Sequence, residues 1–206
     1  MNEVRQIQAS DDLAAFEARV TSCRLCAGRF AATATAHAPR PVAWLSATAP
    51  ILISGQAPGM RVHKSGLPFD DASGDRLRDW LGVDRASFYD RDRFAVMPMA
   101  FCFPGYDAKG ADLPPPKVCA DTWRAEALAL MPHVRLTLLV GGYAQGWTLG
   151  TRSVTAAVAD WRARLPEVVP LPHPSWRNGG WLKKNPDFEA ETLPWLRERV
   201  AELLGT

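Results

Sequence analysis

The feature of this 206-residue chain that most limits its fold is an alternation of short apolar runs with longer amphipathic segments. The clearest run is VRLTLLV at residues 134–140, which Gly141 and Gly142 bring to an end. Runs this short and this apolar are typical of strands buried on both faces, and parallel strands need a long connection between them, usually a helix. The alternation therefore predicts an α/β fold around a parallel sheet that helices cover on both faces.

The other elements follow from the same periodicity. Further apolar runs predict strands at residues 50–54, 94–99 and 168–171. Amphipathic patterns predict helices at residues 11–20, 73–81, 116–131, 154–165 and from 186 towards the C-terminal end. Ser10 and Ser73 are the predicted N-caps of the first two helices, Gly82 ends the second, and Pro194 breaks or kinks the last. We expect one domain that spans residues 1–206.

Composition excludes two broad classes of protein. The chain is 47% hydrophobic and 22% charged, which favours a folded core over disorder. No apolar run approaches the ~18 residues of a membrane span, and the N-terminus lacks the pattern of a signal peptide. We therefore expect no membrane association and a cytoplasmic location. The net charge of +2 is uninformative, but residues 55–69 and 172–184 carry cations and no acid. Such loops fit a polyanion, although chance explains them about equally well.

Four cysteines form a candidate metal centre: Cys23 and Cys26 in a CxxC pair, then Cys102 and Cys119. A CxxC pair places two thiolates within reach of one centre. The second pair lacks that spacing, so a zinc ribbon is not predicted. Spacing alone leaves zinc, an iron–sulfur centre and four unrelated buried thiols open.

Three motifs occur together: GQAPGMRVHKSGLPF at residues 55–69, the four cysteines, and HPS at residues 173–175. In this combination they resemble the uracil-DNA glycosylase superfamily, and above all its iron–sulfur branch. That branch has G-E-A-P-G followed by G-x-P-F at the same spacing, a CxxC pair with two later cysteines, and a late H-P-S. The resemblance covers the chain from Cys23 to the C-terminal end. It implies a three-layer α/β/α sandwich with a short central parallel sheet.

The resemblance also implies roles for individual residues. Cys23, Cys26, Cys102 and Cys119 would bind a 4Fe-4S cluster, with zinc as the alternative cofactor. His173 would donate a hydrogen bond to the departing base, and Gln56 is the second catalytic candidate. The residues implied to bind the base are Gln56, Ala57, Phe69, Met99 and His173. Those implied to bind DNA are Pro58, Lys64, Ser65, Ser175, Trp176, Arg177 and Asn178. Either Trp176 or Arg177 would wedge into the space that the base leaves.

The chain departs from the family pattern at the positions that decide chemistry. Gln56 replaces the family's Glu, and Ala57 stands where other relatives carry Asp. Neither side chain is a general base, and the loop from Gly55 to Phe69 contains no carboxylate. Pro98 replaces the Asn that reads uracil, so we expect a wider substrate range. Phe103 to Val118 contains no His, so covalent trapping of the base is not expected.

These observations predict a monofunctional glycosylase that excises deaminated bases from single- or double-stranded DNA. Uracil is the first candidate substrate, and hypoxanthine and xanthine are further candidates. We expect a monomer. Two alternatives remain: an iron–sulfur protein that recognises damaged bases without excising them, and a zinc-stabilised nucleotide-binding module. Asp70, Asp71 and Asp75 are the nearby carboxylates that would replace the missing base if the chemistry needs one.

Overall fold

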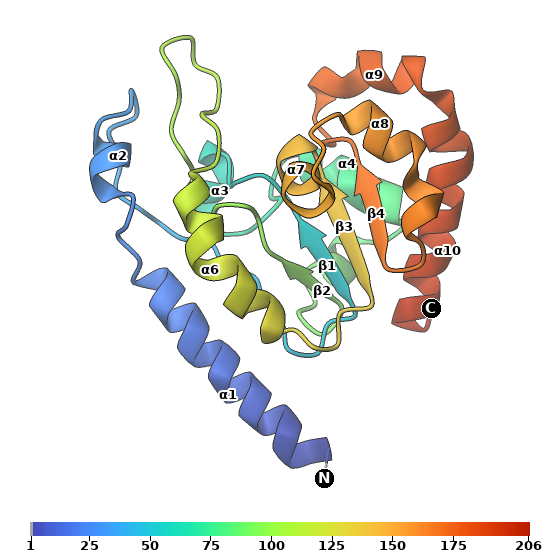
Figure 1. Cartoon of the computed structure of the whole chain (residues 1–206), viewed down its shortest axis with the longest axis horizontal. Coiled ribbons are helices and arrows are strands. Elements are labelled where there is room, and N and C mark those ends of the chain that lie inside the picture. Colours follow the sequence, from blue (N-terminus) through green and yellow to red (C-terminus); the bar gives the residue numbers. More distant parts are fainter. Residues whose placement is uncertain (1) are drawn as a thin grey trace.

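A computed structural model describes residues 2–206 of the chain and the side chains of residues 11–206. The centre is a four-stranded parallel sheet in the order β2-β1-β3-β4. Its strands are β1 (Ile51–Ser54), β2 (Phe94–Val96), β3 (Leu136–Val140) and β4 (Val168–Leu171). Helices cover both faces of this sheet, so the predicted three-layer α/β architecture is confirmed (Figure 1).

Helices connect the strands as the periodicity predicts. The chain begins with α1 (Asn2–Thr21) and α2 (Ala27–Ala31), and α3 (Met60–Ser65), α4 (Ala72–Leu81) and α5 (Arg85–Phe88) connect β1 to β2. Then α6 (Lys117–Ala129) leads to β3, and α7 (Gly142–Leu149), α8 (Val154–Ala159) and the 3-10 turn η1 (Trp161–Arg164) lead to β4. After β4 follow η2 (Trp176–Asn178), α9 (Gly179–Lys184), the π-helical turn η3 (Phe188–Thr192) and α10 (Leu193–Leu204).

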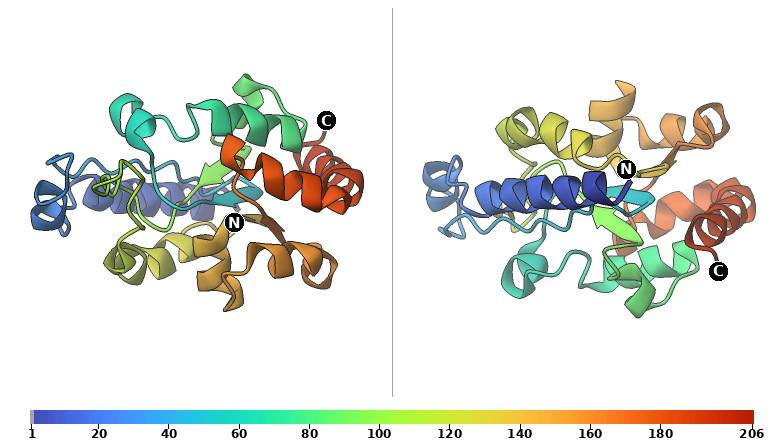
Figure 2. Two further views of the ribbon diagram at one scale, coloured as in Figure 1. Left: turned by 90° about the horizontal axis from the view of Figure 1, so that it is seen from above. Right: turned by 90° about the horizontal axis from the view of Figure 1, so that it is seen from below.

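The layers separate cleanly around the strands. Seen from above, the green helices α4 and α5 lie on one side of the sheet and the yellow and orange helices α6 and α7 on the other (Figure 2). Alternation along β1 explains this arrangement, because Ile51 and Ile53 join the core cluster of α4 and α10 whereas Leu52 joins that of α1 and α6. All three side chains are fully buried.

Four predicted boundaries were wrong for local reasons. The strand predicted for residues 94–99 ends at Val96, two residues before Pro98, which cannot donate to a sheet ladder. Ser10 is not an N-cap, because α1 begins at Asn2 and runs through it. Asp71 rather than Ser73 caps α4, and its carboxylate accepts from the backbone N–H of Gly74 at 3.0 Å. The helix predicted for residues 154–165 changes to a 3-10 turn after Ala159. Gly82 ends α4 in a left-handed conformation, as predicted. Pro194 lies at the start of α10, directly after the π-helical turn η3, so the regular helix is interrupted next to it.

None of the described helices is both long and apolar enough to cross a membrane.

Candidate active site and cysteine pocket

The loop after β1 lies beside the segment after β2, at the carboxyl edge of the sheet. The backbone N–H of Met99 donates to the carbonyl of Gly55 at 3.0 Å, and that of Ala100 donates to the carbonyl of Gln56 at 3.2 Å. The contact between the two chain segments therefore continues beyond both strands. It places Met99 next to Gln56, two of the predicted base-binding residues.

Phe69 closes this loop in an unusual conformation. Its φ is 54°, in the left-handed region that a bulky residue rarely adopts. The half-buried ring lies against Gly55, where an added Cβ would stand 3.6 Å from Phe69 Cζ. The ring of Phe88 meets it edge-on, with 6.2 Å between the centroids. Strained backbone of this kind persists only where its surroundings fix it, and it is concentrated at functional sites.

The first turn of α4 fixes Phe69 by close approach. A Cβ added at Gly74 would lie 1.8 Å from the carbonyl oxygen of Phe69, so only glycine fits there. The guanidinium of Arg78 reaches the same carbonyl at 3.4 Å. Just before it, the hydroxyl of Tyr89 donates to the carbonyl of Pro68 at 2.9 Å. Phe69 is therefore held from the protein side while part of its ring remains exposed.

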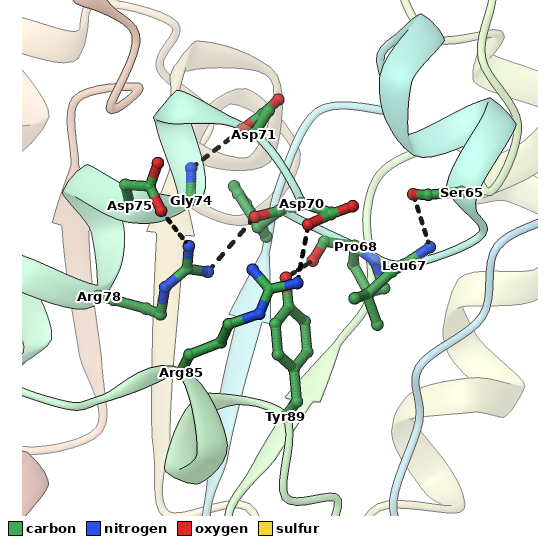
Figure 3. Close-up of polar contacts among 11 residues, drawn as sticks. Ser65, Leu67, Pro68, Asp70, Asp71, Gly74, Asp75, Arg78, Arg85 and Tyr89 are labelled. Carbon is green, nitrogen blue, oxygen red and sulfur yellow. Dashed lines mark hydrogen bonds and ion pairs between the residues drawn. The ribbon is translucent and has the colours of Figure 1, made fainter.

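The three carboxylates after the loop have different surroundings (Figure 3). Asp70 pairs with Arg85 at 2.9 Å, and Asp75 pairs with Arg78 at 2.6 Å. The Arg85 guanidinium, through its hydrogen bond, holds the pKa of Asp70 below its usual range. Asp71 caps α4, and it is the carboxylate whose charge acts on His173. If any of the three replaces the missing general base, Asp71 is the best placed.

His173 follows β4 and packs on the end of β3. A Cβ added at Gly141 would lie 3.6 Å from the Cβ of His173, and the side-chain amide of Asn178 donates to the His173 carbonyl at 2.6 Å. Burial lowers the pKa of His173, with the charge of Asp71 acting in the opposite direction. The imidazole is therefore neutral near pH 7, and one ring nitrogen carries a proton that it can donate.

A buried cation lies at the carboxyl end of β1, and no sequence pattern revealed it. Arg124 of α6 is 4% exposed and donates to the hydroxyl of Ser54, the last residue of β1, at 2.9 Å. Its Nε and Nη1 have no hydrogen-bond partner among the described residues. Burial lowers the pKa of Arg124 to about 10, so the group stays charged at neutral pH. A positive charge therefore lies at the carboxyl end of β1, next to Gly55.

The predicted DNA-binding residues lie on two segments. Ser175 caps η2 through its hydroxyl, and Arg76 of α4 donates to its carbonyl at 3.0 Å. Trp176 is 74% exposed, with the Arg177 guanidinium 5.7 Å from its ring centroid. On the other segment, Lys64 and Ser65 lie in an open groove lined further by Met60, Arg61, Asp70 and Tyr106. Ala57 is half-buried and Pro58 is buried, so we restrict Pro58 to shaping the loop.

All four cysteines line one pocket. Cys23 and Cys26 come from the turn between α1 and α2, Cys102 follows β2, and Cys119 lies in the first turn of α6. The other lining residues are Leu25, Phe30, Pro39, Ala100, Pro116 and Trp123. Within the described part of the chain, no three or more His, Cys, Asp or Glu side chains are grouped closely enough to hold one metal ion. The thiols thus surround a common space without converging on one point.

The thiols raise one another's pKa within this apolar pocket. Burial raises the pKa of Cys102 to about 12 and that of Cys119 to about 11. Charge on Cys23 and Cys26 adds to both shifts. The backbone N–H of Phe101 faces the sulfur of Cys119 at 3.4 Å. Without a metal Cys102 and Cys119 remain protonated, and a bound cation would have to displace their protons. Thiols around one space are the donor type that zinc and iron–sulfur centres use.

A family model described as the uracil DNA glycosylase superfamily matches residues 42–197. The chain belongs to this superfamily. The matched region contains the sheet, the loop from Gly55 to Phe69 and the HPS segment, while Cys23 and Cys26 precede it. Members of the superfamily are DNA glycosylases, and the fold observed here is consistent with membership.

The sequence did not reveal three residues that contact and support the segments of this uracil-DNA-glycosylase-like site. Gly74 lies against the Phe69 carbonyl, whereas Arg76 and Arg124 form hydrogen bonds with Ser175 and Ser54, which are far from them in the chain. Gly74 alone left a local signal, because a glycine in the first turn of a predicted helix calls for a packing reason.

Proposed function

We propose that this protein is a monofunctional DNA glycosylase that hydrolyses the N-glycosidic bond of deaminated bases in base excision repair. Its substrates include uracil, with hypoxanthine and xanthine as further candidates. The observation that carries the proposal is the strained, half-exposed Phe69 held against Gly55 beside Gln56 and Met99. An aromatic face fixed at this place is what a flipped-out base needs for stacking.

The mechanism acts mainly on the leaving group. The bond between C1′ and the base nitrogen breaks, its electron pair goes to the base, and an oxocarbenium-like sugar forms. The neutral His173 donates its N–H to the base oxygen that gains charge. Water then adds to C1′ and loses a proton to solvent, and the anionic base takes up a proton from solvent. The products are the free base and DNA with an abasic site.

The loop itself supplies little to the attacking water. Gln56 carries an amide and Ala57 a methyl group, so neither removes a proton. No lysine is placed as a nucleophile by a motif, so cleavage of the strand is not part of the reaction. Pro98 has no side-chain donor, and rejection of related bases is strong only where a buried polar group would be left unpaired. A substrate range beyond uracil follows.

The test is incubation with oligonucleotides that carry one uracil, hypoxanthine or xanthine, single-stranded and paired, followed by alkali. Abasic sites that alkali converts to breaks, with undamaged DNA intact, support the proposal. Breaks before alkali would contradict a monofunctional enzyme. The missing loop carboxylate favours a second candidate, a protein that binds damaged DNA without excision. That candidate predicts binding to these oligonucleotides without abasic sites.

We further propose that the cysteine pocket holds a 4Fe-4S cluster, with zinc as the alternative. Such a cluster would tie the segment between α1 and α2 to the chain after β2 and to α6. The purified protein should then be brown, with broad absorption near ~400 nm. Cys119→Ser should remove this colour and reduce solubility, whereas Val118→Ser at its exposed neighbour should not. Stoichiometric zinc without iron in anaerobically prepared protein would reject the cluster.

Trp176 is proposed as the wedge that helps to extrude the base. Trp176→Ala should slow excision from paired DNA more than from single strands, because little unstacking is needed in a single strand. Trp147→Ala is the control, since Trp147 is also an exposed tryptophan but lies on α7. Equal losses for both strand types in Trp176→Ala, measured in single turnover, would remove Trp176 from this role.

A further inference from the structure

A segment at residues 37–42 clamps the part of the chain that carries Cys102. The backbone N–H of Val42 donates to the carbonyl of Phe101 at 2.7 Å. On the other side of Cys102, Nε2 of His37 bonds to the carbonyl of Phe103 at 2.9 Å. Pro39, between these two contacts, lines the cysteine pocket. We call residues 37–42 the strap.

The His37 ring connects the strap to three other segments. It stacks on Phe30 of α2 with 5.0 Å between centroids, and it lies 5.1 Å from the ring of Phe103. His63 of α3 meets it edge-on at 5.2 Å. Because a carbonyl only accepts hydrogen bonds, Nε2 of His37 is the protonated nitrogen, and Nδ1 accepts from the hydroxyl of Thr35 at 2.8 Å. The ring is thus fixed by stacking and by hydrogen bonds at both nitrogens.

Arg40 extends from the strap to α3, which lies within the loop from Gly55 to Phe69. Its Nη1 donates to the carbonyl of His63 at 2.5 Å and to that of Lys64 at 2.6 Å. These carbonyls belong to the last turn of α3, which Gly66 ends at φ 76°. A Cβ added at Gly66 would lie 3.1 Å from Nη2 of Arg40. Pro39, the residue before Arg40, lines the cysteine pocket. The strap therefore contacts the cysteine pocket through Pro39 and α3 through Arg40.

Helix α3 depends on such support. It has six residues and no side-chain cap at its N-terminus. Isolated helices of this length are unstable, and the carbonyls of a last turn need partners from elsewhere. A cation at the C-terminal end also complements the helix dipole. Arg40 supplies both.

We propose that Arg40 is a positioning residue that couples the cysteine pocket to α3 and so to the substrate loop, residues 55–69. When the pocket is filled, the strap is fixed and Arg40 holds the last turn of α3. When the pocket is empty, the strap loosens and that turn frays. This proposal rests on the proposed function only because it calls residues 55–69 a substrate loop. Its second part, the effect of filling or emptying the pocket, rests on the proposed cysteine centre.

Hydrogen exchange of the full chain, followed by mass spectrometry over residues 60–69, measures this coupling. Wild type is compared with Arg40→Ala and Arg40→Lys, each as purified and after removal of metal by oxidation and chelation. Iron and zinc are measured in every sample. Arg24→Ala is the matched control, because Arg24 is also a cation beside the pocket but bonds to the carbonyls of Thr21 and Cys23.

We expect Arg40→Ala to raise the exchange rate over residues 60–69 by about tenfold with unchanged metal content, as loss of a charged hydrogen-bond partner predicts. Arg40→Lys should give a smaller rise, and Arg24→Ala none. Metal removal should raise exchange there in wild type and add little in Arg40→Ala. The proposal would be overturned if exchange in Arg40→Ala equalled that of wild type, or if Arg40→Ala lost its metal as its exchange rose. It would also be overturned if metal removal raised exchange equally in wild type and in Arg40→Ala. If purified wild type contains no metal, the cysteine centre and its coupling to α3 are both rejected. The comparison of wild type with Arg40→Ala would then still decide whether Arg40 holds α3.

Discussion

His173→Ala should slow base excision by about 10²–10³-fold in single turnover, the usual cost of removing one donor to a developing oxyanion. The loop provides no general base, so the reaction depends on stabilising the departing base. His173 is half-buried and neutral, and the side-chain amide of Asn178 holds its backbone, so the residue is fixed in place before the reaction begins. Gln56→Ala should cost clearly less, because an amide orients a water or a base edge without accepting its proton.

Asp71 provides the decisive comparison for this mechanism. Asp71→Asn keeps an N-cap for α4, since Asn and Asp cap helices about equally well, but it removes the only one of the three carboxylates that acts on His173. We expect a smaller loss than in His173→Ala. Asp70→Asn and Asp75→Asn serve as controls, because their carboxylates already pair with Arg85 and Arg78. A loss in Asp71→Asn greater than that in His173→Ala would show that Asp71 is a relocated general base.

The sequence predicted all four strands because each is a short apolar run, and it placed the ends of β1 and β3 where the run has a clear stop. Val140 is followed by two glycines, and Ser54 by the loop glycine Gly55, so both ends were readable. Helix ends were predicted less well. Local patterns do not show whether a polar segment continues a helix, as α1 does through Ser10, or which of several capping residues is used at α4.

The motif residues of the candidate site were readable, but not the groups that hold them. Arg124 lies in an ordinary amphipathic helix, and nothing in its neighbours indicates that it is buried with Nε and Nη1 unpaired among the described residues. Arg40 sits in a Pro-rich segment that reads as a loop, yet its guanidinium supports α3. Such roles depend on contacts between segments far apart in the chain, which composition and periodicity do not encode.

Gly74→Ala should be among the most damaging single substitutions in this chain. The added Cβ would overlap the carbonyl oxygen of Phe69, at 1.8 Å, and a backbone atom cannot move aside as a side chain can. Overpacking of this kind costs about 3 kcal/mol. For a domain of this size the melting temperature should therefore fall by roughly 6–12 °C. Gly180→Ala is the matched control, since an added Cβ in α9 meets nothing within 4 Å.

Gly74→Ala also tests whether the position of Phe69 affects excision independently of the stability of the fold. If α4 moves away to accommodate the methyl group, Phe69 loses the contact that holds it at φ 54° and leaves Gly55. Excision at a temperature where Gly74→Ala is fully folded should then fall, whereas Gly180→Ala should keep wild-type activity and gain up to about 1 kcal/mol from helix propensity. Calorimetry and single-turnover excision on the same preparations give both values. A folded Gly74→Ala with normal excision would mean that the left-handed Phe69 is not what stacks on the base.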